Sequence, residues 1–470
     1  MLRETHGRHG GLDLSDDWRF APPNQAPKHP MTTPSSQAGV VFWFRNDLRL
    51  HDNPALVQAI ALAERRSTWL LPVFVQGSAL QDSSPWGFVR ASDHRRAWTA
   101  MAVSDAAQQL AALGSQLLPL AGAPSQVLAD CLQALGASTL VCEEIAAPEE
   151  LAQIQALRQR GLEVHTVWQS SLMAPESLPF APADVPDVFS AFRRAVERHG
   201  CAPAEPLPAV TRMPPLPPQG LPVSPAEAGA GVCAPLCDPR SAFPWAQAEF
   251  HGGERAALAH LARYCSRGLP HSYKATRNGL CGPDYSTKWS PWLATGALSA
   301  RQAWAAIAAF EAQQGASEST YWIQLELLWR DHFRWLHLKH GARMYWRRGL
   351  SDAPLAPLRH DARRLQRWCS GQTGQPLIDA GMRELLATGY SSNRLRQNLA
   401  SFLIHDLGCD WRAGAAWFES QLIDYDVYNN QGNWLYLSGR GTDPRGSRRF
   451  NPDKQAQDYD ADGAFRRLWL

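Results

Sequence analysis

Residues suited to binding chemistry are concentrated near the C-terminus of this 470-residue chain. Asp424 and Asp426 stand two positions apart, and the run 430–436 mixes carboxamides with tryptophan and tyrosine. Upstream, residues 392–397 add a serine, an asparagine and two arginines. A helical domain needs an apolar face in order to fold, but it does not need this mixture. A large polar aromatic cofactor with a phosphate tail does need it, because its ring and its phosphates require different partners.

A second polar segment precedes a helical stretch. Thr287, Lys288 and Ser290 supply two hydroxyls and an amine, and they follow Tyr273 by a short interval. Such donors suit a pyrophosphate, which binds well to cations and to N–H or O–H groups. Thr287 or Ser290 alone would more simply be an ordinary helix N-cap.

A third group falls within one helical turn. Glu326, Trp329 and Arg330 lie on neighbouring faces of a helix that we expect over 320–340. Taken alone, they predict a tryptophan packed in a helical core with a flanking surface ion pair.

The elements that must position these groups fall into two classes. Apolar runs alternate with segments of helical spacing from Gly39 to about residue 170, and no GxGxxG follows the first run, which disfavours a nicotinamide-type Rossmann site. This alternation predicts an α/β domain with a doubly wound parallel sheet. The expected strands are 40–44, 69–75, 116–120, 139–143 and 164–168, and the expected helices are 53–66, 92–113, 124–135 and 149–160.

The second half predicts an all-α domain, because helical spacing runs almost throughout. Twelve of the 35 prolines lie in 199–245, so we expect 171–245 to be an interdomain linker, extended and wrapped on the surface. We expect 1–38 to be a disordered extension, or sequence upstream of an internal start at Met31, followed by domains at 39–170 and 246–470. The expected helices are 254–266, 299–313, 320–340, 362–368, 377–388, 392–407 and 413–422.

Composition excludes several classes of protein. No apolar run approaches the roughly 18 residues of a membrane span, and the first 38 residues lack the apolar core of a secretory signal. Cys233 and Cys237 lack partner ligands, so we expect no zinc site there. We expect the cysteines to be reduced thiols in a cytoplasmic protein. We also expect the protein to be a monomer. The net charge of +2 hides a basic half, since residues 246–470 hold 28 Lys+Arg against 21 Asp+Glu. A basic half favours a polyanion partner.

The run WFRNDLRLHDNPAL at 43–56 resembles the N-terminal signature of the photolyase/cryptochrome family. Taken singly, its residues would be helix capping and surface charge, with Asn53 as the cap. The second, third and C-terminal groups match the same family, over about residues 39–470. The resemblance implies FAD bound by Tyr273, Thr287, Lys288, Trp289, Ser290, Asn393, Arg396, Asp424, Asp426 and Asn430.

The resemblance also assigns catalytic and DNA-binding roles. Glu326 would hydrogen-bond the damaged base, Trp329 and Tyr436 would flank it, and Asn430 would face the flavin N5. Trp434 and Trp411 would relay electrons to the flavin. The DNA contacts would be Arg277, Glu326, Trp329, Arg394, Gln397, Lys454 and Gln455.

Within the family, the chain resembles the DASH-type cryptochromes. Tyr436 stands where bacterial class I photolyases have a second tryptophan, Gln397 stands where they have methionine, and 238–244 and 441–460 resemble DASH segments. The implied reaction is blue-light-driven repair of cyclobutane pyrimidine dimers by electron transfer from reduced FAD, favouring single-stranded DNA. The alternative is a photoreceptor that binds FAD and DNA but signals. A dark FAD oxidoreductase is the weakest interpretation.

Two positions depart from the family pattern or stay open. Leu358 stands where the family has the outer tryptophan of its electron relay, and leucine cannot take that role. Trp346, Trp368 or a tyrosine could replace it, or photoreduction could be slow. Glu144 lies in a segment similar to the DASH folate site, which implies 5,10-methenyltetrahydrofolate as an antenna. An ordinary surface acid at a helix start explains Glu144 equally well.

Overall fold

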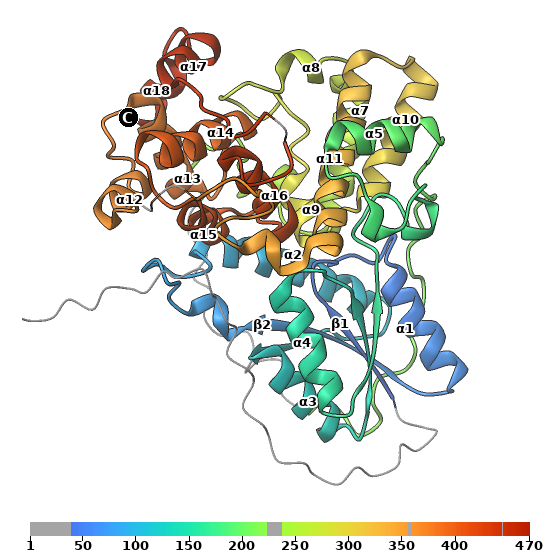
Figure 1. Ribbon diagram of the computed structural model, residues 1–470. Helices are drawn as coiled ribbons and strands as arrows, with labels where there is room; N and C mark the ends of the chain where they lie inside the picture. The colour runs from blue at the N-terminus through green and yellow to red at the C-terminus, as the bar shows by residue number, and fades with distance from the viewer. Residues whose placement is uncertain (1–38, 223–236, 356, 358, 444) are drawn as a thin grey trace, which may run out of the picture.

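A computed structural model describes residues 39–222, 237–355, 357, 359–443 and 445–470. The expectations for 1–38, for Cys233 and for Leu358 lie outside these residues. The described chain forms an α/β domain, which is at the bottom of Figure 1, and a helical domain above it.

The α/β domain is built on five parallel strands in the order β3-β2-β1-β4-β5. Alternate residues of the central strand serve opposite faces, as the pleat requires. The elements are β1 Val40–Phe44, α1 Pro54–Arg65, β2 Leu70–Gly77, α2 Asp93–Ala112, β3 Leu118–Gly122, α3 Pro124–Ala134, β4 Thr139–Glu143, α4 Pro148–Gln159 and β5 Glu163–Val167. Val41 and Trp43 pack with α3 and α4, whereas Val40 and Phe42 pack with α1 and α2. The predicted doubly wound sheet is therefore confirmed.

The described part of the connecting segment 171–245 is more buried than its proline content predicts. Its middle part is extended along the α/β domain, where Leu70 N–H donates to the Pro215 carbonyl at 3.0 Å. However, it also contains helix α5 (Phe189–Arg198), and Val185 and Phe243 are fully buried. The expectation of a surface-wrapped linker is wrong for these parts, because their aromatic and aliphatic side chains complete the core of the helical domain.

The helical domain surrounds the long helix α11 (Figure 1). All seven expected helices are present. Within 246–470, five α-helices of the described chain were not expected, namely the short α8, α9, α17 and α18 and the longer α16, whose carboxamides obscure the apolar period on its buried face. The remaining elements are α7 Glu254–Ser266, α8 Tyr273–Thr276, α9 Ser290–Thr295, α10 Ala300–Gln314, α11 Glu318–His340, α12 Ala362–Cys369, α13 Pro376–Thr388, α14 Asn393–Ser401, α15 Trp411–Gln421, α16 Val427–Ser438, α17 Pro452–Tyr459 and α18 Ala464–Trp469. Among the described helices, none is long and apolar enough for a bilayer crossing.

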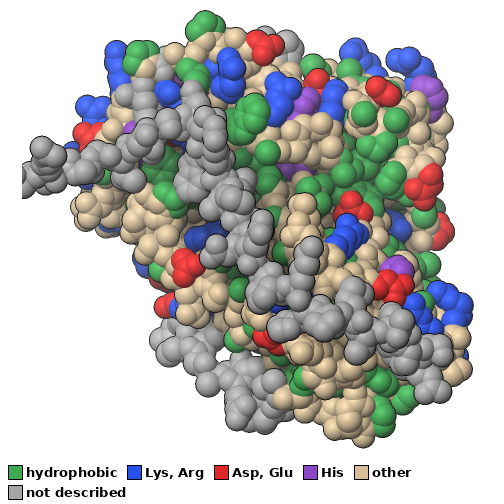
Figure 2. Space-filling model, turned by 60° about the horizontal axis from the view of Figure 1, so that its bottom comes forward, with side chains coloured by type: hydrophobic (Ala, Val, Ile, Leu, Met, Phe, Trp, Pro, Cys, Tyr) green, Lys and Arg blue, Asp and Glu red, His purple; other side chains and the backbone are tan. Residues whose placement is uncertain are grey.

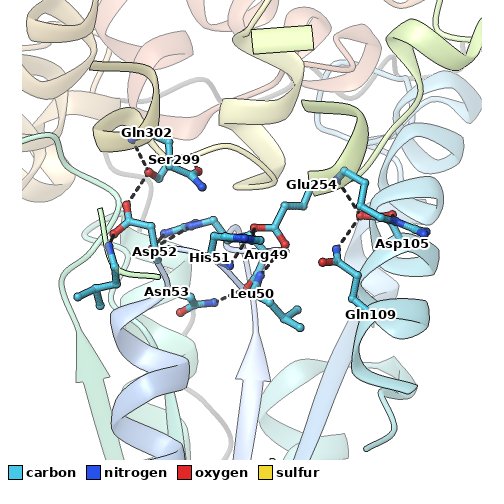
Figure 3. Close-up of polar contacts among 12 residues, drawn as sticks. Arg49, Leu50, His51, Asp52, Asn53, Asp105, Gln109, Glu254, Ser299 and Gln302 are labelled. Atoms are coloured by element: carbon cyan, nitrogen blue, oxygen red, sulfur yellow. Dashed lines mark hydrogen bonds and ion pairs between the residues drawn. The ribbon is translucent and has the colours of Figure 1, made fainter. Parts of the chain in front are cut away.

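The polar run after β1 joins the two domains (Figure 3). Glu254 of α7 accepts from the backbone N–H groups of Leu50 at 2.8 Å and His51 at 2.9 Å. Asp52 accepts from the Ser299 hydroxyl at 2.5 Å and from the Arg301 guanidinium at 2.6 Å. These buried contacts fix the orientation of the helical domain on the sheet.

The surface charge is mixed on the face that Figure 2 displays. Lys and Arg side chains are interspersed there with Asp and Glu, outside the grey residues. This distribution fits a chain whose net charge is only +2.

Candidate cofactor and nucleic-acid site

A buried ion pair lies at the centre of the candidate cofactor site. Arg396 of α14 donates through Nη2 to Oδ2 of Asp424 at 2.8 Å and through Nε to the Ser391 carbonyl at 2.9 Å. Ser392 caps α14 by accepting from Leu395 N–H, which sets the direction from which Arg396 leaves the helix. Oδ1 of Asp424 is buried and finds no hydrogen-bond partner among the described residues. The pair therefore presents an unused acceptor to a ligand.

A second buried cation lies nearby. Lys288 and Arg396 both approach the ring of Tyr390, with the charged group 5.0 Å and 5.6 Å from its centroid. The Lys288 ammonium also lies 3.3 Å from the Tyr285 ring, and its Nζ has no hydrogen-bond partner within the described chain. Burial lowers the pKa of Lys288 well below its usual range. A phosphate would supply the missing acceptors and raise this pKa again, because a nearby anion favours the charged form of an amine.

Glu384 also belongs to this cluster, although the sequence analysis did not select it. It is 1% exposed on α13, and burial raises the pKa of its carboxyl to about 8. Its Oε2, like the Tyr285 and Ser391 hydroxyls, has no partner among the described residues. An acid within the mostly apolar run 382–388 was the available clue, because acids are rarely buried unpaired. Several orphaned donors and acceptors in one place fit a large polar cofactor with a phosphate tail.

The other residues of the second segment surround Lys288. Tyr273 is buried at the start of α8, Trp289 precedes α9 with its indole N–H unpaired within the described chain, and Ser290 is exposed at the first turn. The Thr287 carbonyl is 3.0 Å from Nε2 of His260, and burial lowers the pKa of His260 to about 4. The neutral imidazole can therefore hold the Thr287 backbone without adding charge to the site.

The three remaining expected cofactor residues lie in different surroundings. Asn393 is exposed at the start of α14, and Nδ2 of Asn430 donates to the Ala415 carbonyl at 3.0 Å. Asp426 caps α16 through Asn429 N–H and accepts from Arg334 at 2.6 Å. Both Asp426 oxygens are therefore already engaged, and this carboxylate lines a small interdomain cavity instead of presenting a free acceptor.

A separate group of expected site residues lies on and beside α11. Glu326 makes a close ion pair with Arg277 of the segment after α8. Burial raises the pKa of Glu326, and Arg277 opposes that rise. Tyr436 of α16 lies edge-on to Trp329, with 6.1 Å between ring centroids and 72° between planes. Trp329 and Tyr436 are thus brought together, and Glu326 lies one helical turn before Trp329 on α11.

Four of the expected DNA contacts, Arg394, Gln397, Lys454 and Gln455, lie on α14 and α17. Arg394 donates to Oδ1 of Asn278 at 3.0 Å and to Oε1 of Gln397 at 2.9 Å. Asn278 directly follows Arg277, the partner of Glu326, and so connects the two groups. Oε1 of Gln455 accepts from Asn398 at 3.2 Å, and Lys454 is exposed one position earlier on α17. A backbone phosphate would find cations and amides along this edge.

The two expected relay tryptophans lie on the packed helices α15 and α16. Trp434 is buried against Gly414, where a Cβ atom would lie 2.2 Å from the indole. The Trp411 indole donates to the Arg347 carbonyl at 3.1 Å, and the adjacent Trp346 is 44% exposed. Trp368 is fully buried, so of these two tryptophans Trp346 is the one that reaches solvent, and a tyrosine stays an alternative.

Glu144 directly follows β4, at the carboxyl edge of the sheet. Its backbone N–H donates to the Val167 carbonyl at 2.8 Å, and its carboxylate accepts from Thr166 at 3.4 Å. The folate antenna stays a prediction. Among the described residues, no group of three or more histidines, cysteines and acids could hold a metal ion.

Comparisons with known proteins identify the family of this chain. Residues 40–213 match the family model described as DNA photolyase, and residues 322–470 match the FAD binding domain of DNA photolyase. The chain is 41% identical to cryptochrome DASH of Gloeobacter violaceus, over 92% of this chain and 85% of that protein. It is 42% identical to cryptochrome DASH of Xenopus laevis, over 92% and 82%.

Solved structures show the same similarity. The fold matches the Synechocystis cryptochrome with a TM-score of 0.84 and 39% identity, covering 92% of this chain and 88% of that one. It matches a class III photolyase from Agrobacterium tumefaciens with a TM-score of 0.74 and 28% identity, covering 92% and 86%. The chain therefore belongs to the photolyase/cryptochrome family, in which it is similar to the DASH-type cryptochromes.

Proposed function

We propose that this protein is a blue-light-driven, FAD-dependent lyase that splits cyclobutane pyrimidine dimers by electron transfer. One observation carries the proposal: the half-buried Glu326–Arg277 ion pair lies one helical turn from Trp329, whose indole meets the Tyr436 ring, and Asn278, next to Arg277, accepts from Arg394. A damaged base needs such a combination of stacking surface, hydrogen-bonding group and phosphate contact.

The residues at the unsatisfied polar cluster would hold FAD. Lys288 supports the phosphates, and Asp424, oriented by Arg396, offers its free oxygen to a ring N–H. When reduced FAD is bound and illuminated, it supplies one electron to the dimer, which splits and returns it. Asn393, Asn430, Tyr273, Thr287, Trp289, Ser290 and Asp426 complete the proposed cofactor residues.

Trp329 and Tyr436 support a preference for single-stranded DNA. A lesion must leave the base stack to enter the pocket, which costs a few kcal/mol in a duplex and least in a single strand. Stacking on aromatic side chains recovers roughly 1–3 kcal/mol per base. A pocket with one tyrosine in place of a second indole recovers less of the cost of extrusion from a duplex.

We also propose a location, an oligomeric state, an antenna and domain bounds for this protein. They are a cytoplasmic monomer, a 5,10-methenyltetrahydrofolate antenna near Glu144, and separate domains at 39–170 and 246–470. The alternative function is a photoreceptor that binds FAD and DNA but signals. The smaller stacking energy expected with Tyr436 favours this alternative, because a photoreceptor does not need to bind a lesion tightly.

Repair of defined oligonucleotides tests the proposal. The purified protein, with FAD bound and reduced, is illuminated with blue light in the presence of single- or double-stranded DNA that contains a thymine dimer. Restored thymines on single strands, with few on duplex, support the proposal. Equal repair of both contradicts the argument from Tyr436. No repair with bound, reduced FAD supports the photoreceptor.

A further inference from the structure

One face of the Trp329 indole is covered by a residue from the connecting segment. Phe189, at the first turn of α5, lies parallel to the Trp329 indole, with 3.6 Å between ring centroids and 14° between planes. The other described rings near Trp329 are inclined to it, Phe333 by 39°, His332 by 69° and Tyr436 by 72°. One face of the indole is therefore covered by a flat hydrocarbon ring.

The segment that carries Phe189 contacts α11 both before and after this residue, and Figure 1 shows α5 close to α11. Before Phe189, Lys339 donates to the Val185 carbonyl at 2.8 Å and pairs with Asp187 at 3.0 Å. Nε2 of His332 lies 2.8 Å from the Pro186 carbonyl, and burial lowers the pKa of His332 to about 4. The neutral ring can donate this hydrogen bond at physiological pH.

The fastening continues after Phe189. Phe192 is fully buried and lies 4.9 Å from His332, ring centroid to ring centroid. Farther along α5, Glu197 accepts from the Tyr321 hydroxyl at 2.6 Å, and Tyr321 lies two turns of α11 before Trp329. Contacts on both sides hold Phe189 in place, so it does not act as a gate that swings away from the indole.

We propose that Phe189 is a positioning residue that holds Trp329 in the orientation needed to stack on a damaged base. The inference rests on the proposed function. The covered face is closed to DNA, so one base stacks on the opposite face, and the pocket becomes a layered arrangement of base, Trp329 and Phe189. Without Phe189, the indole would be free to tilt toward the vacated space, and part of the stacking energy would be spent on ordering it.

Three substitutions of Phe189 distinguish the effect of its flat aromatic ring from the effect of its apolar volume. Phe189→Tyr keeps the flat ring, Phe189→Leu keeps much of the apolar volume, and Phe189→Ala removes both. Phe180→Ala is the matched control, because Phe180 belongs to the same segment and contacts Phe192 at 6.0 Å without stacking on Trp329. The measurement is the dark dissociation constant of the FAD-loaded protein for a single strand with one thymine dimer, beside the undamaged strand.

We expect Phe189→Ala to weaken binding of the dimer strand by about 3- to 10-fold, the range that one aromatic pair contributes. Phe189→Leu should weaken it similarly, Phe189→Tyr should restore it to within about twofold, and binding of the undamaged strand should be unchanged. An unaltered dimer affinity in Phe189→Ala, or an equal loss in Phe180→Ala, overturns the proposal.

A second measurement distinguishes failure of this inference from failure of the proposed function. If wild type does not prefer the dimer strand, the proposed function fails. The near-UV circular dichroism of DNA-free protein then still tests the contact, with the difference between wild type and Trp329→Phe defining the Trp329 signal. Loss of that signal in Phe189→Ala and its retention in Phe189→Tyr support positioning, whereas retention in both refutes it.

Discussion

Lys288→Met should change the apo protein and the FAD complex in opposite directions. Lys288 is 2% exposed, and its amine has no hydrogen-bond partner among the described residues. Its φ of +58° lies in the left-handed region, but methionine pays the same backbone cost as lysine there. The substitution therefore removes the unpaired buried amine and leaves the local backbone strain unchanged.

The expected gain for the apo protein follows from the buried amine. An unsatisfied buried donor costs about 1–3 kcal/mol, and the contact with the Tyr285 ring offsets part of this. Its neighbour Glu384 has a pKa of about 8, so that carboxyl is mostly neutral at pH 7 and is not left as a bare charge. We expect the free energy of unfolding of apo Lys288→Met to rise by about 1–2 kcal/mol.

The expected loss for FAD binding follows from the phosphates. Hydrogen bonds to charged groups contribute about 1.5–3 kcal/mol, so their removal should weaken FAD binding about 10- to 150-fold. Protein stripped of FAD is titrated with FAD by calorimetry, and the apo form is unfolded in urea. Lys274→Met is the control, because Lys274 is half-exposed and pairs with Glu318, and its FAD affinity should stay within about twofold. Unchanged FAD affinity in Lys288→Met, or a destabilised apo protein, would refute the assignment of Lys288 to the phosphates.

Three further predictions concern the other groups. Burial raises the pKa of Glu384 to about 8, so the free energy of unfolding of the wild-type apo protein should fall from about pH 4.5 to 8, because the carboxyl ionises first in the unfolded state. Glu384→Gln should reduce this pH dependence, which thermal unfolding at a series of pH values measures. Tyr436→Trp should raise the ratio of duplex to single-strand repair under blue light, because a second indole facing Trp329 recovers more stacking energy; an unchanged ratio would contradict the pocket argument. Arg394→Gln should weaken binding of damaged and undamaged single strands alike and reduce the salt slope of log K by about 0.7 in a salt titration, whereas a loss confined to damaged DNA would exclude a phosphate contact.

Much of the architecture could be predicted because its causes are local. The apolar run 40–44 becomes a strand buried on both faces, and Asn53 caps α1 by accepting from Leu56 N–H at 3.1 Å. Helix α5 could not be predicted from the composition of 171–245, because the surrounding prolines dominate that signal. Its position depends on long-range contacts with α11, and so does the stacking of Phe189 on Trp329.

The roles of the polar motifs could not be predicted from sequence, because charged residues of the same type either join the two domains or remain available to a ligand. Glu254 and Asp52 are buried acids whose oxygens are met by backbone N–H, hydroxyl and guanidinium donors at the domain junction. Asp424, Lys288 and Glu384 are equally buried, yet each keeps a polar atom without a partner in the described chain. Because an unmet buried polar group costs free energy, the satisfied set is architectural, and the unsatisfied set is explained by a ligand that completes it. FAD should therefore stabilise the helical domain more than the α/β domain, since the unmet groups that it would satisfy lie in the helical domain.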